Sequence, residues 1–275
     1  MEAEKTKEQL YEEDLQRLRG FRPMDDDFMR MLFRKNLPLA QLVLRIITGI
    51  DDLIITEEET QYDLKRLVGA RSLCLDVYGT DSSGKKYDLE IQRADSGARP
   101  HRARYHSSAM DVENLSANQE FEELPDTYTI FITEKDIYGA GEPIYIIDRV
   151  NKTTGRDFED GEHIIYVNGA YEGDSDIGKL MHDFRCTSAD DMNYTLLAEQ
   201  TRYYKENPEG VSKMCKEMED MRNETAKRTE EQTTLMHIRS IMDSLGMTVE
   251  KAMETLKIPQ SDREEYVKYF GKTSV

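Results

Sequence analysis

Apolar positions recur along the chain at two spacings, and the change of spacing divides the sequence into three parts. From residue 24 to about residue 50 the apolar residues follow a helical spacing, with a break expected at Pro38 and a stop at Gly49. The middle part holds runs rich in Ile, Val, Tyr and Thr, which are the residues that strands favour. These runs are "RSLCLDVYGT", "KKYDLEIQRA", "TYTIFIT", "EPIYIIDRV" and "HIIYVNG". A helical stretch, "RPHRARYHSSAMDVENLSANQEF", separates the second run from the third, so we expect an α/β or α+β core.

The last part of the chain has a helical pattern throughout, from about residue 174 onward. Met214, Met218 and Met221 form one apolar stripe at helical spacing, which we interpret as a packing face. Residues 222–234, "RNETAKRTEEQTT", are almost free of apolar side chains and predict a solvated helix or a linker. We therefore expect a charged leader at 1–23, a core at 24–185 and a helical C-terminal region at 186–275.

The composition narrows the classes of function. The chain has 275 residues, 33% of them charged, and a net charge of −18. Such a charge argues against a protein that coats nucleic acid nonspecifically, but it is compatible with an enzyme that holds phosphates through metal ions. Three widely spaced cysteines without a CxxC pair predict reduced thiols, and the acidic N-terminus does not resemble a secretory signal. No apolar run approaches the roughly 20 residues of a membrane span, so we expect a cytoplasmic protein without a membrane segment.

The most informative stretch is "KKYDLEIQRAD", at residues 85–95. Asp88, Glu90 and Gln92 alternate with Leu89 and Ile91. In a strand, the three polar side chains would therefore share one face and the two apolar ones the other. A turn signal, "DSSG", lies just before this stretch and separates it from the preceding strand-like run.

The two runs on either side of this turn are expected to pair as a hairpin. A three-residue loop, with Gly84 in a left-handed conformation, sets Thr80 opposite Lys86. The same register, continued outward, sets Asp76 opposite Glu90. Two like charges in such a pair are destabilising unless a cation lies between them, and carboxylate oxygens suit Mg²⁺ or Mn²⁺. From the spacing alone, two interpretations stay open: a metal site, and an exposed hairpin with acids on its solvent face.

At these residues the sequence resembles the PD-(D/E)XK nucleases. The hairpin "LDVYGTDSSGKKYDLEIQ" resembles their D…(D/E)xK hairpin, in the D…ExQ form of the recombination-promoting nuclease and transposase-like branch. The stretches "DDFMRMLF", "RARYHSSAM", "YTIFITEKDIYGAGEPIYIIDR", "HIIYVNG" and "IGKLMHDFRC" resemble further segments of that branch, over roughly residues 24–220. The resemblance implies an α/β, restriction-endonuclease-like core, with a mixed central β-sheet flanked by helices, and an all-helical C-terminal region.

The resemblance also implies which residues form the catalytic site. Asp76 and Glu90 match the two acids that bind the metal in this family, and the backbone carbonyl of Ile91 matches an additional ligand. Gln92 completes the implied catalytic set. Asp26 matches an acid of the opening helix, although a role in stabilising the helix dipole is the alternative there. The cofactor implied is Mg²⁺ or Mn²⁺.

The partner implied by the resemblance is DNA, cleaved by hydrolysis of a phosphodiester bond. Gln92 stands where the name-giving motif has Lys, and a neutral amide can orient water but supplies no charge. The basic stretch "ARPHRARYH" offers Arg99, Arg102 and Arg104 to phosphate oxygens, or else to the many nearby acids. The net charge and Gln92 favour an alternative function, that of a nuclease-fold binding or regulatory module without turnover.

Two other features carry less weight. His182 in "LMHDF" lies beside an acid near a helix end, where a histidine is more often structural than a ligand or a base. The last two helices suggest helix-turn-helix DNA binding, but the final one begins "SDREEY", which is acidic where phosphate would approach. We interpret these helices as packing, or as the contact of a homo-oligomer. A structural or interaction protein is therefore a further function left open.

Overall fold

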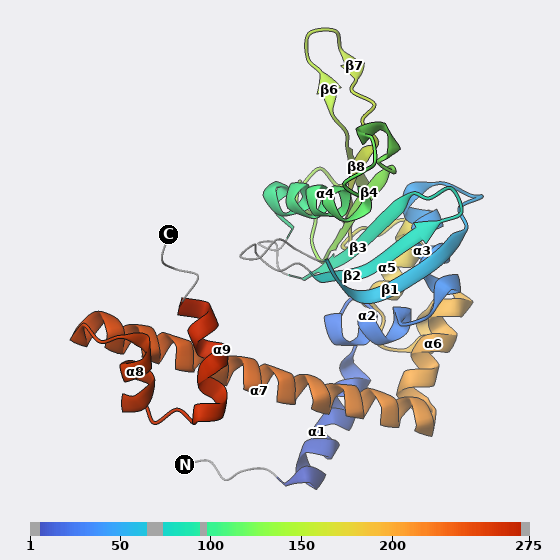
Figure 1. Cartoon of the computed structure of the whole chain (residues 1–275). Coiled ribbons are helices and arrows are strands. Elements are labelled where there is room, and N and C mark those ends of the chain that lie inside the picture. The colour runs from blue at the N-terminus through green and yellow to red at the C-terminus, as the bar shows by residue number, and fades with distance from the viewer. Residues whose placement is uncertain (1–5, 65–73, 94–97, 271–275) are drawn as a thin grey trace. The chain divides into compact units, whose positions relative to one another are not determined.

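A mixed β-sheet of six strands forms the centre of the fold (Figure 1). The first three strands pair antiparallel, the next two join in parallel, and the last edge strand is again antiparallel to its neighbour. Each of the strand-like runs in the sequence contributes a strand, so the mixed sheet is confirmed. In order across the sheet, the strands are β1 (Ile55–Asp63), β2 (Cys74–Asp81), β3 (Lys86–Gln92), β4 (Thr127–Thr133), β8 (Glu162–Asn168) and β5 (Ile144–Ile147).

The computed structural model describes residues 6–64, 74–93 and 98–270. The chain divides into two compact units, Met1–Cys215 and Lys216–Val275, and the sheet belongs to the first. Within the described ranges, none of the helices combines the length and the apolar character that crossing a membrane requires.

Helices cover both faces of the sheet (Figure 1). On one face, α4 (Pro100–Asn114) packs on β4 and β8, where Ala103, Phe131 and Tyr166 form a buried cluster. On the other face, α3 (Leu37–Thr48) contacts β1 and α5 (Asp176–Arg185). Pro38 lies in the first turn of α3, and Gly49 ends that helix with a left-handed φ of +70°. The break and the stop expected from the sequence are therefore confirmed.

The edge strand β1 is an element that the apolar pattern did not predict. Its sequence, "ITEEETQYD", consists mostly of charged and polar residues, which strands rarely favour. It forms nevertheless because β2 offers an unpaired edge, and the two strands pair antiparallel along almost their whole length. The hairpin strand β2 is thereby a central strand and not an edge of the sheet.

Further helices and a small second sheet complete the first unit. α6 packs on α2 and α3 and belongs to the first unit, which ends at Cys215. The N-terminal leader contains a helix that begins with a capping box at Thr6. These elements are α1 (Lys7–Gly20), α2 (Asp26–Phe33), η2 (Phe121–Glu123), β6 (Val150–Asn151), β7 (Arg156–Asp157), η3 (Ala189–Asp191) and α6 (Thr195–Glu206).

The second unit is helical, as expected for the C-terminal region. It contains the greater part of α7 (Pro208–Leu245), followed by α8 (Val249–Thr255) and α9 (Gln260–Phe270). Its small core is built from Ile238, Ala252, Met253 and Ile258. Residues 222–234 continue α7 without a break, so the almost apolar-free segment is a solvated helix and not a linker.

Candidate metal centre

β2 and β3 form the hairpin that the sequence predicts. Their backbone pairing sets Thr80 opposite Lys86 and Val77 opposite Leu89. Gly84 in the turn has a φ of +90°, a conformation that residues with a Cβ rarely adopt. The expected pairing of Thr80 with Lys86 and the left-handed glycine are confirmed.

Asp76 and Glu90 meet just beyond this paired segment. The backbone N–H of Asp76 donates to Glu90 Oε1 at 2.9 Å, and the N–H of Ile91 donates to Asp76 Oδ2 at 3.3 Å. Gln61 of β1 donates to the other oxygen of Asp76 at 3.2 Å. Side-chain oxygens thus accept these strand N–H groups, and the two residues lie next to each other at the end of the paired segment.

Asp88 adds a third carboxyl group, on the same face of β3 as Glu90, where both are met by residues of α4. Asp88 and Glu90 are both 0% exposed, so neither charge is solvated by water. Burial, together with the charges of the neighbouring acids, raises the pKa values of Asp88 and Glu90 well above their usual range, and burial also raises the pKa of Asp76. Among the residues described, Asp88 Oδ1 finds no hydrogen-bond partner. This cluster therefore favours the uptake of a cation or of protons.

Two residues of α4, Arg102 and His106, cover the acids. Arg102 Nη2 donates to Glu90 Oε2 at 2.8 Å, and its Nη1 donates to Gln92 Oε1 at 2.9 Å. His106 Nδ1 lies 2.9 Å from Asp88 Oδ2, and His106 Nε2 accepts from Arg102 Nε at 3.1 Å. Because positions four apart share one side of a helix, both residues reach the sheet from α4.

A family model described as "PD-(D/E)XK nuclease family transposase" matches residues 41–170. The matched segment contains the hairpin with its three acids, as well as Arg102 and His106 on α4. The matched segment is identified as a PD-(D/E)XK nuclease family transposase domain. The six-stranded mixed sheet with its flanking helices is consistent with the restriction-endonuclease-like fold of a PD-(D/E)XK domain. No curated protein and no solved structure matches the chain.

Asp26, the acid expected from the opening helix, is the first residue of α2 and lies outside the matched segment. Its charge is among those that raise the pKa of Asp76, so it lies within electrostatic reach of the PD-(D/E)XK hairpin. Partial burial raises the pKa of Asp26 itself. The acids on either side of it in sequence both form ion pairs with arginines. Asp26 thus differs from its two neighbours, whose carboxylates are held by arginines.

The three arginines of the basic stretch separate into two groups. Arg102 pairs with Glu90, which is the alternative that the sequence left open beside phosphate contact. Arg99 and Arg104 are exposed, and Arg99 is the residue from which α4 begins. The structure thus brings Arg102 into the described hydrogen-bond network of the PD-(D/E)XK acids, and leaves Arg99 and Arg104 on the surface of the helix.

Asp88 and His106 are the members of this network whose part the sequence did not reveal. Two signals pointed to them, since Asp88 shares a face with Glu90 and His106 lies four positions after Arg102. Neither signal shows that this face of α4 packs on this face of β3. Only the tertiary fold of the PD-(D/E)XK domain sets that contact.

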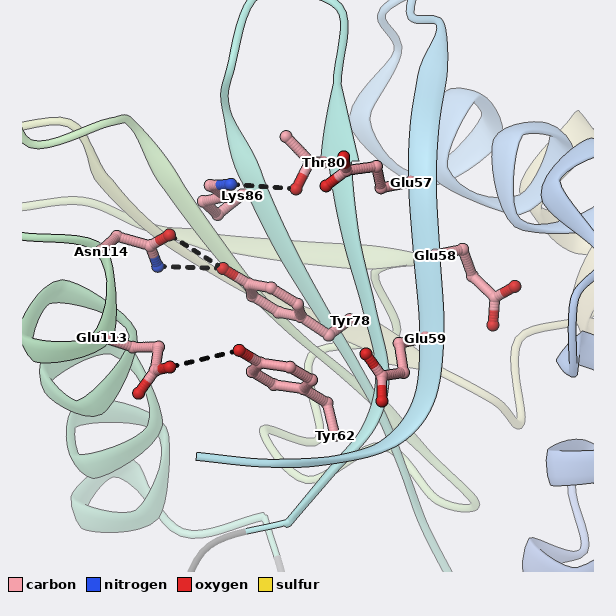
Figure 2. Close-up of a pocket in the computed structure, with 9 residues that line it drawn as sticks. All are labelled: Glu57, Glu58, Glu59, Tyr62, Tyr78, Thr80, Lys86, Glu113 and Asn114. Atoms are coloured by element: carbon pink, nitrogen blue, oxygen red, sulfur yellow. Dashed lines mark hydrogen bonds between the residues drawn. The ribbon is translucent and has the colours of Figure 1, made fainter. Parts of the chain in front are cut away.

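A pocket of about 420 Å³ lies on the same face of the sheet as the acids (Figure 2). Its floor is a stacked pair of rings, Tyr62 and Tyr78, whose centroids are 4.8 Å apart. The hydroxyl groups of these tyrosines are held by two residues at the end of α4, Glu113 and Asn114. Glu57, Glu59 and Lys86 also line the pocket, so it extends the polar face of the PD-(D/E)XK hairpin along β1 and β2.

His182 belongs to a separate cluster in which it, Asp183 and Cys186 place ligand-type atoms within 4.8 Å of one another. The Asp183 carboxylate, however, already accepts the backbone N–H groups of Asn193 and Tyr194 at 2.8 to 2.9 Å. These bonds hold the segment that leads into α6. This arrangement agrees with the structural interpretation of His182.

The donor set on the hairpin fits a hard divalent cation. Asp76 and Glu90 offer carboxylate oxygens, Ile91 follows with its carbonyl oxygen, and such oxygens are the preferred ligands of Mg²⁺ and Mn²⁺. Burial and the charges of neighbouring acids raise the pKa values of Asp88 and Glu90, so a nearby cation would stabilise their ionised forms. A bound cation would relieve that repulsion, so the residues of the PD-(D/E)XK domain suit the metal implied by the family.

Proposed function

We propose that this protein is a metal-dependent endonuclease that hydrolyses phosphodiester bonds of DNA. The observation that supports the proposal is the hydrogen bond from the backbone N–H of Asp76 to the Glu90 carboxylate, within the segment that matches a PD-(D/E)XK nuclease family model. Asp76, Glu90 and the carbonyl of Ile91 hold Mg²⁺ or Mn²⁺, and Asp26 approaches from α2 as a further ligand. The raised pKa values of the acids support this assignment, because they indicate a place where positive charge is missing.

Each protein group in this proposal has a separate task. When bound, the divalent ion supplies Lewis acidity, which stabilises the charge that develops on the phosphate. Gln92 orients the attacking water or the phosphate through its amide. Arg99 and Arg104 stand exposed on α4 and contact phosphates of the DNA backbone, as arginines commonly do without reading sequence. The net charge of −18 makes such local cations and the metal necessary for approach to DNA.

A plasmid-nicking assay with Mg²⁺ or Mn²⁺ tests the proposal. The parent protein should convert supercoiled DNA to open circles, and Asp76→Ala and Glu90→Ala should each reduce cleavage to background. Glu57→Ala removes the same charge from an exposed position on β1 and serves as the matched control. A parent that cleaves DNA with no divalent ion, or alanine variants that cleave as fast as the parent, would contradict the proposal.

The arrangement of Glu90 also favours a second candidate function, a binding or regulatory module that does not turn over. Both of its carboxylate oxygens already accept hydrogen bonds, from Asp76 N–H and from Arg102. In this case the parent would bind Mn²⁺ and DNA but leave the plasmid intact with every divalent ion.

We also propose that the protein acts in the cytoplasm and associates with further copies through its C-terminal helices. Support for association comes from large apolar side chains that are exposed there, among them Met236 (64%) and Leu245 (61%) on α7. Light scattering of the full chain tests this, and a monomer at every concentration would contradict it.

A further inference from the structure

We propose that Arg102 supplies the positive charge that Gln92 cannot, and that the buried pair Asp88 and His106 positions it. This inference rests on the proposed function, because it assigns a catalytic residue and two positioning residues to that same site. It differs from a role in general phosphate binding, since it places the guanidinium of Arg102 at the centre of the D…ExQ motif.

The guanidinium of Arg102 touches both functional residues of β3. Its Nη2 lies 2.8 Å from Glu90 Oε2 and its Nη1 lies 2.9 Å from Gln92 Oε1. Because a guanidinium is planar and always charged, two such bonds fix both its position and its plane. The positive charge of Arg102 therefore lies against the Glu90 carboxylate and the Gln92 amide. Gln92 is the position at which this sequence has an amide and the name-giving motif has a cationic Lys.

His106 holds Arg102 from the other side, and its protonation follows from the contacts. Arginine only donates, so His106 Nε2 must accept the bond from Arg102 Nε at 3.1 Å. The imidazole proton then resides on Nδ1, which donates to Asp88 Oδ2 at 2.9 Å. The chain Asp88–His106–Arg102 is thus a directional series of hydrogen bonds with a neutral imidazole in the middle.

The burial of this series suits a positioning role. The side chains of Asp88 and His106 are 0% exposed, whereas that of Arg102 is 37% exposed. Asp88 and His106 are fixed in the core, whereas Arg102 reaches the surface from which a substrate would approach. The ring of Phe131 lies beneath the guanidinium, with its centroid 5.8 Å from Arg102 Cζ, and adds a packing restraint.

A competing explanation is a second metal site, because Asp88, Glu90 and His106 have ligand-type atoms within 4.8 Å of one another. A metal on His106 Nδ1 would have to displace the proton that is donated to Asp88. The proton would then move to Nε2 and face the N–H of Arg102, so the bond between them would be lost. The observed bonds therefore favour the arginine series over a metal at His106.

This arrangement predicts opposite effects on metal binding and on cleavage. Arg102 competes with a cation for Glu90 Oε2, so its removal should strengthen the binding of Mn²⁺. The same removal takes away a positive charge that stabilises the transition state, so cleavage should become slower. A residue that merely supports the fold would weaken metal binding and cleavage together.

The experiment measures Mn²⁺ affinity by titration calorimetry and single-turnover plasmid nicking for Arg102→Ala, Arg102→Lys and the parent. We expect Arg102→Ala to bind Mn²⁺ several-fold more tightly and to cleave at least about tenfold more slowly, with partial recovery on addition of guanidinium chloride at non-denaturing concentration. Lys86→Ala is the matched control, because it removes a cation from β3, the strand of Glu90 and Gln92, where Lys86 donates to Thr80. Arg102→Lys keeps the charge and should lie between the parent and Arg102→Ala in both measurements.

Two substitutions of His106 test the positioning role. Asn and Gln carry the same amide but differ in length. The Gln amide reaches the position of Nε2, where its oxygen can accept from Arg102, whereas the shorter Asn amide reaches only the position of Nδ1, where its N–H can donate to Asp88. We expect the Gln variant to cleave faster than the Asn variant, while two amides in a purely structural role would behave alike. The inference is overturned if Arg102→Ala binds Mn²⁺ no more tightly than Lys86→Ala, or if it cleaves as fast as the parent. A parent that cleaves nothing overturns the proposed function and the catalytic role of Arg102 with it, and the calorimetry then still decides whether Arg102 competes for Glu90.

Discussion

Glu58 tests how the edge strand β1 is placed, because this strand buries an acid on the side of the sheet away from the pocket. Figure 2 shows the Glu58 side chain turned away from the other residues that line the pocket. Burial raises the pKa of Glu58 from its usual 4.5 to about 7, against an opposing effect of the backbone N–H groups of Asn36 and Lys35. At neutral pH and above, the folded state therefore holds a poorly solvated carboxylate, and Glu58→Gln should increase the free energy of unfolding.

The magnitude follows from the shift in the pKa. One pKa unit corresponds to about 1.4 kcal/mol, so a rise from 4.5 to about 7 corresponds to about 3 kcal/mol. The amide of Gln has its own cost of burial, which reduces the expected gain to about 1–2 kcal/mol at about pH 8. Because the folded pKa is raised, the penalty is complete above the folded value and absent below the unfolded value. The gain should therefore vanish at about pH 4.

Urea unfolding at these two pH values measures the gain. Glu57→Gln is the control, since Glu57 is the exposed neighbour on the same strand and should change the stability little at either pH. If Glu58→Gln gave no increase at about pH 8, or the same increase at both pH values, the burial of this carboxylate would not explain the effect and the placement of β1 would be refuted.

Two further predictions concern the hairpin. The raised pKa values of Asp76, Asp88 and Glu90 mean that their cluster loses stability as the pH rises above the usual carboxyl range. Mg²⁺ or Mn²⁺ should therefore raise the melting temperature more at about pH 8 than at about pH 5, and a melting temperature indifferent to metal at about pH 8 would count against the site. Gly84→Ala should lower the free energy of unfolding in urea by about 1–2 kcal/mol, because φ at this position is +90°. The space around Gly84 is open, so the cost comes from the backbone conformation and not from a clash. An unchanged stability would mean that the turn adopts another conformation.

Local information in the sequence was sufficient to predict the hairpin and its acids. The alternation of Asp88, Glu90 and Gln92 with apolar residues assigned the face, and Gly84 in a short loop set the register. That register predicts Asp76 beside Glu90, and the backbone N–H of Asp76 donates to the Glu90 carboxylate. The alternation of side chains along a strand and the conformation of a short turn depend only on residues that are close in sequence. Both can therefore be predicted from one strand and its turn.

Only the tertiary structure determines that β1 forms an edge strand and that Asp88, His106 and Arg102 form a series of hydrogen bonds. β1 has a polar sequence without a strand pattern, and it forms because the open edge of β2 supplies partners for its backbone. The contacts of Arg102 with Glu90 and of His106 with Asp88 join segments that are separated by 12 and 18 positions in sequence. Their spacing on the helix shows that they share a side, but which strand that side covers depends on how the whole helix packs. The sequence by itself thus determined the hairpin and the neighbouring acids Asp76 and Glu90, and the packing of α4 decided that the cation of Arg102 stands next to Glu90.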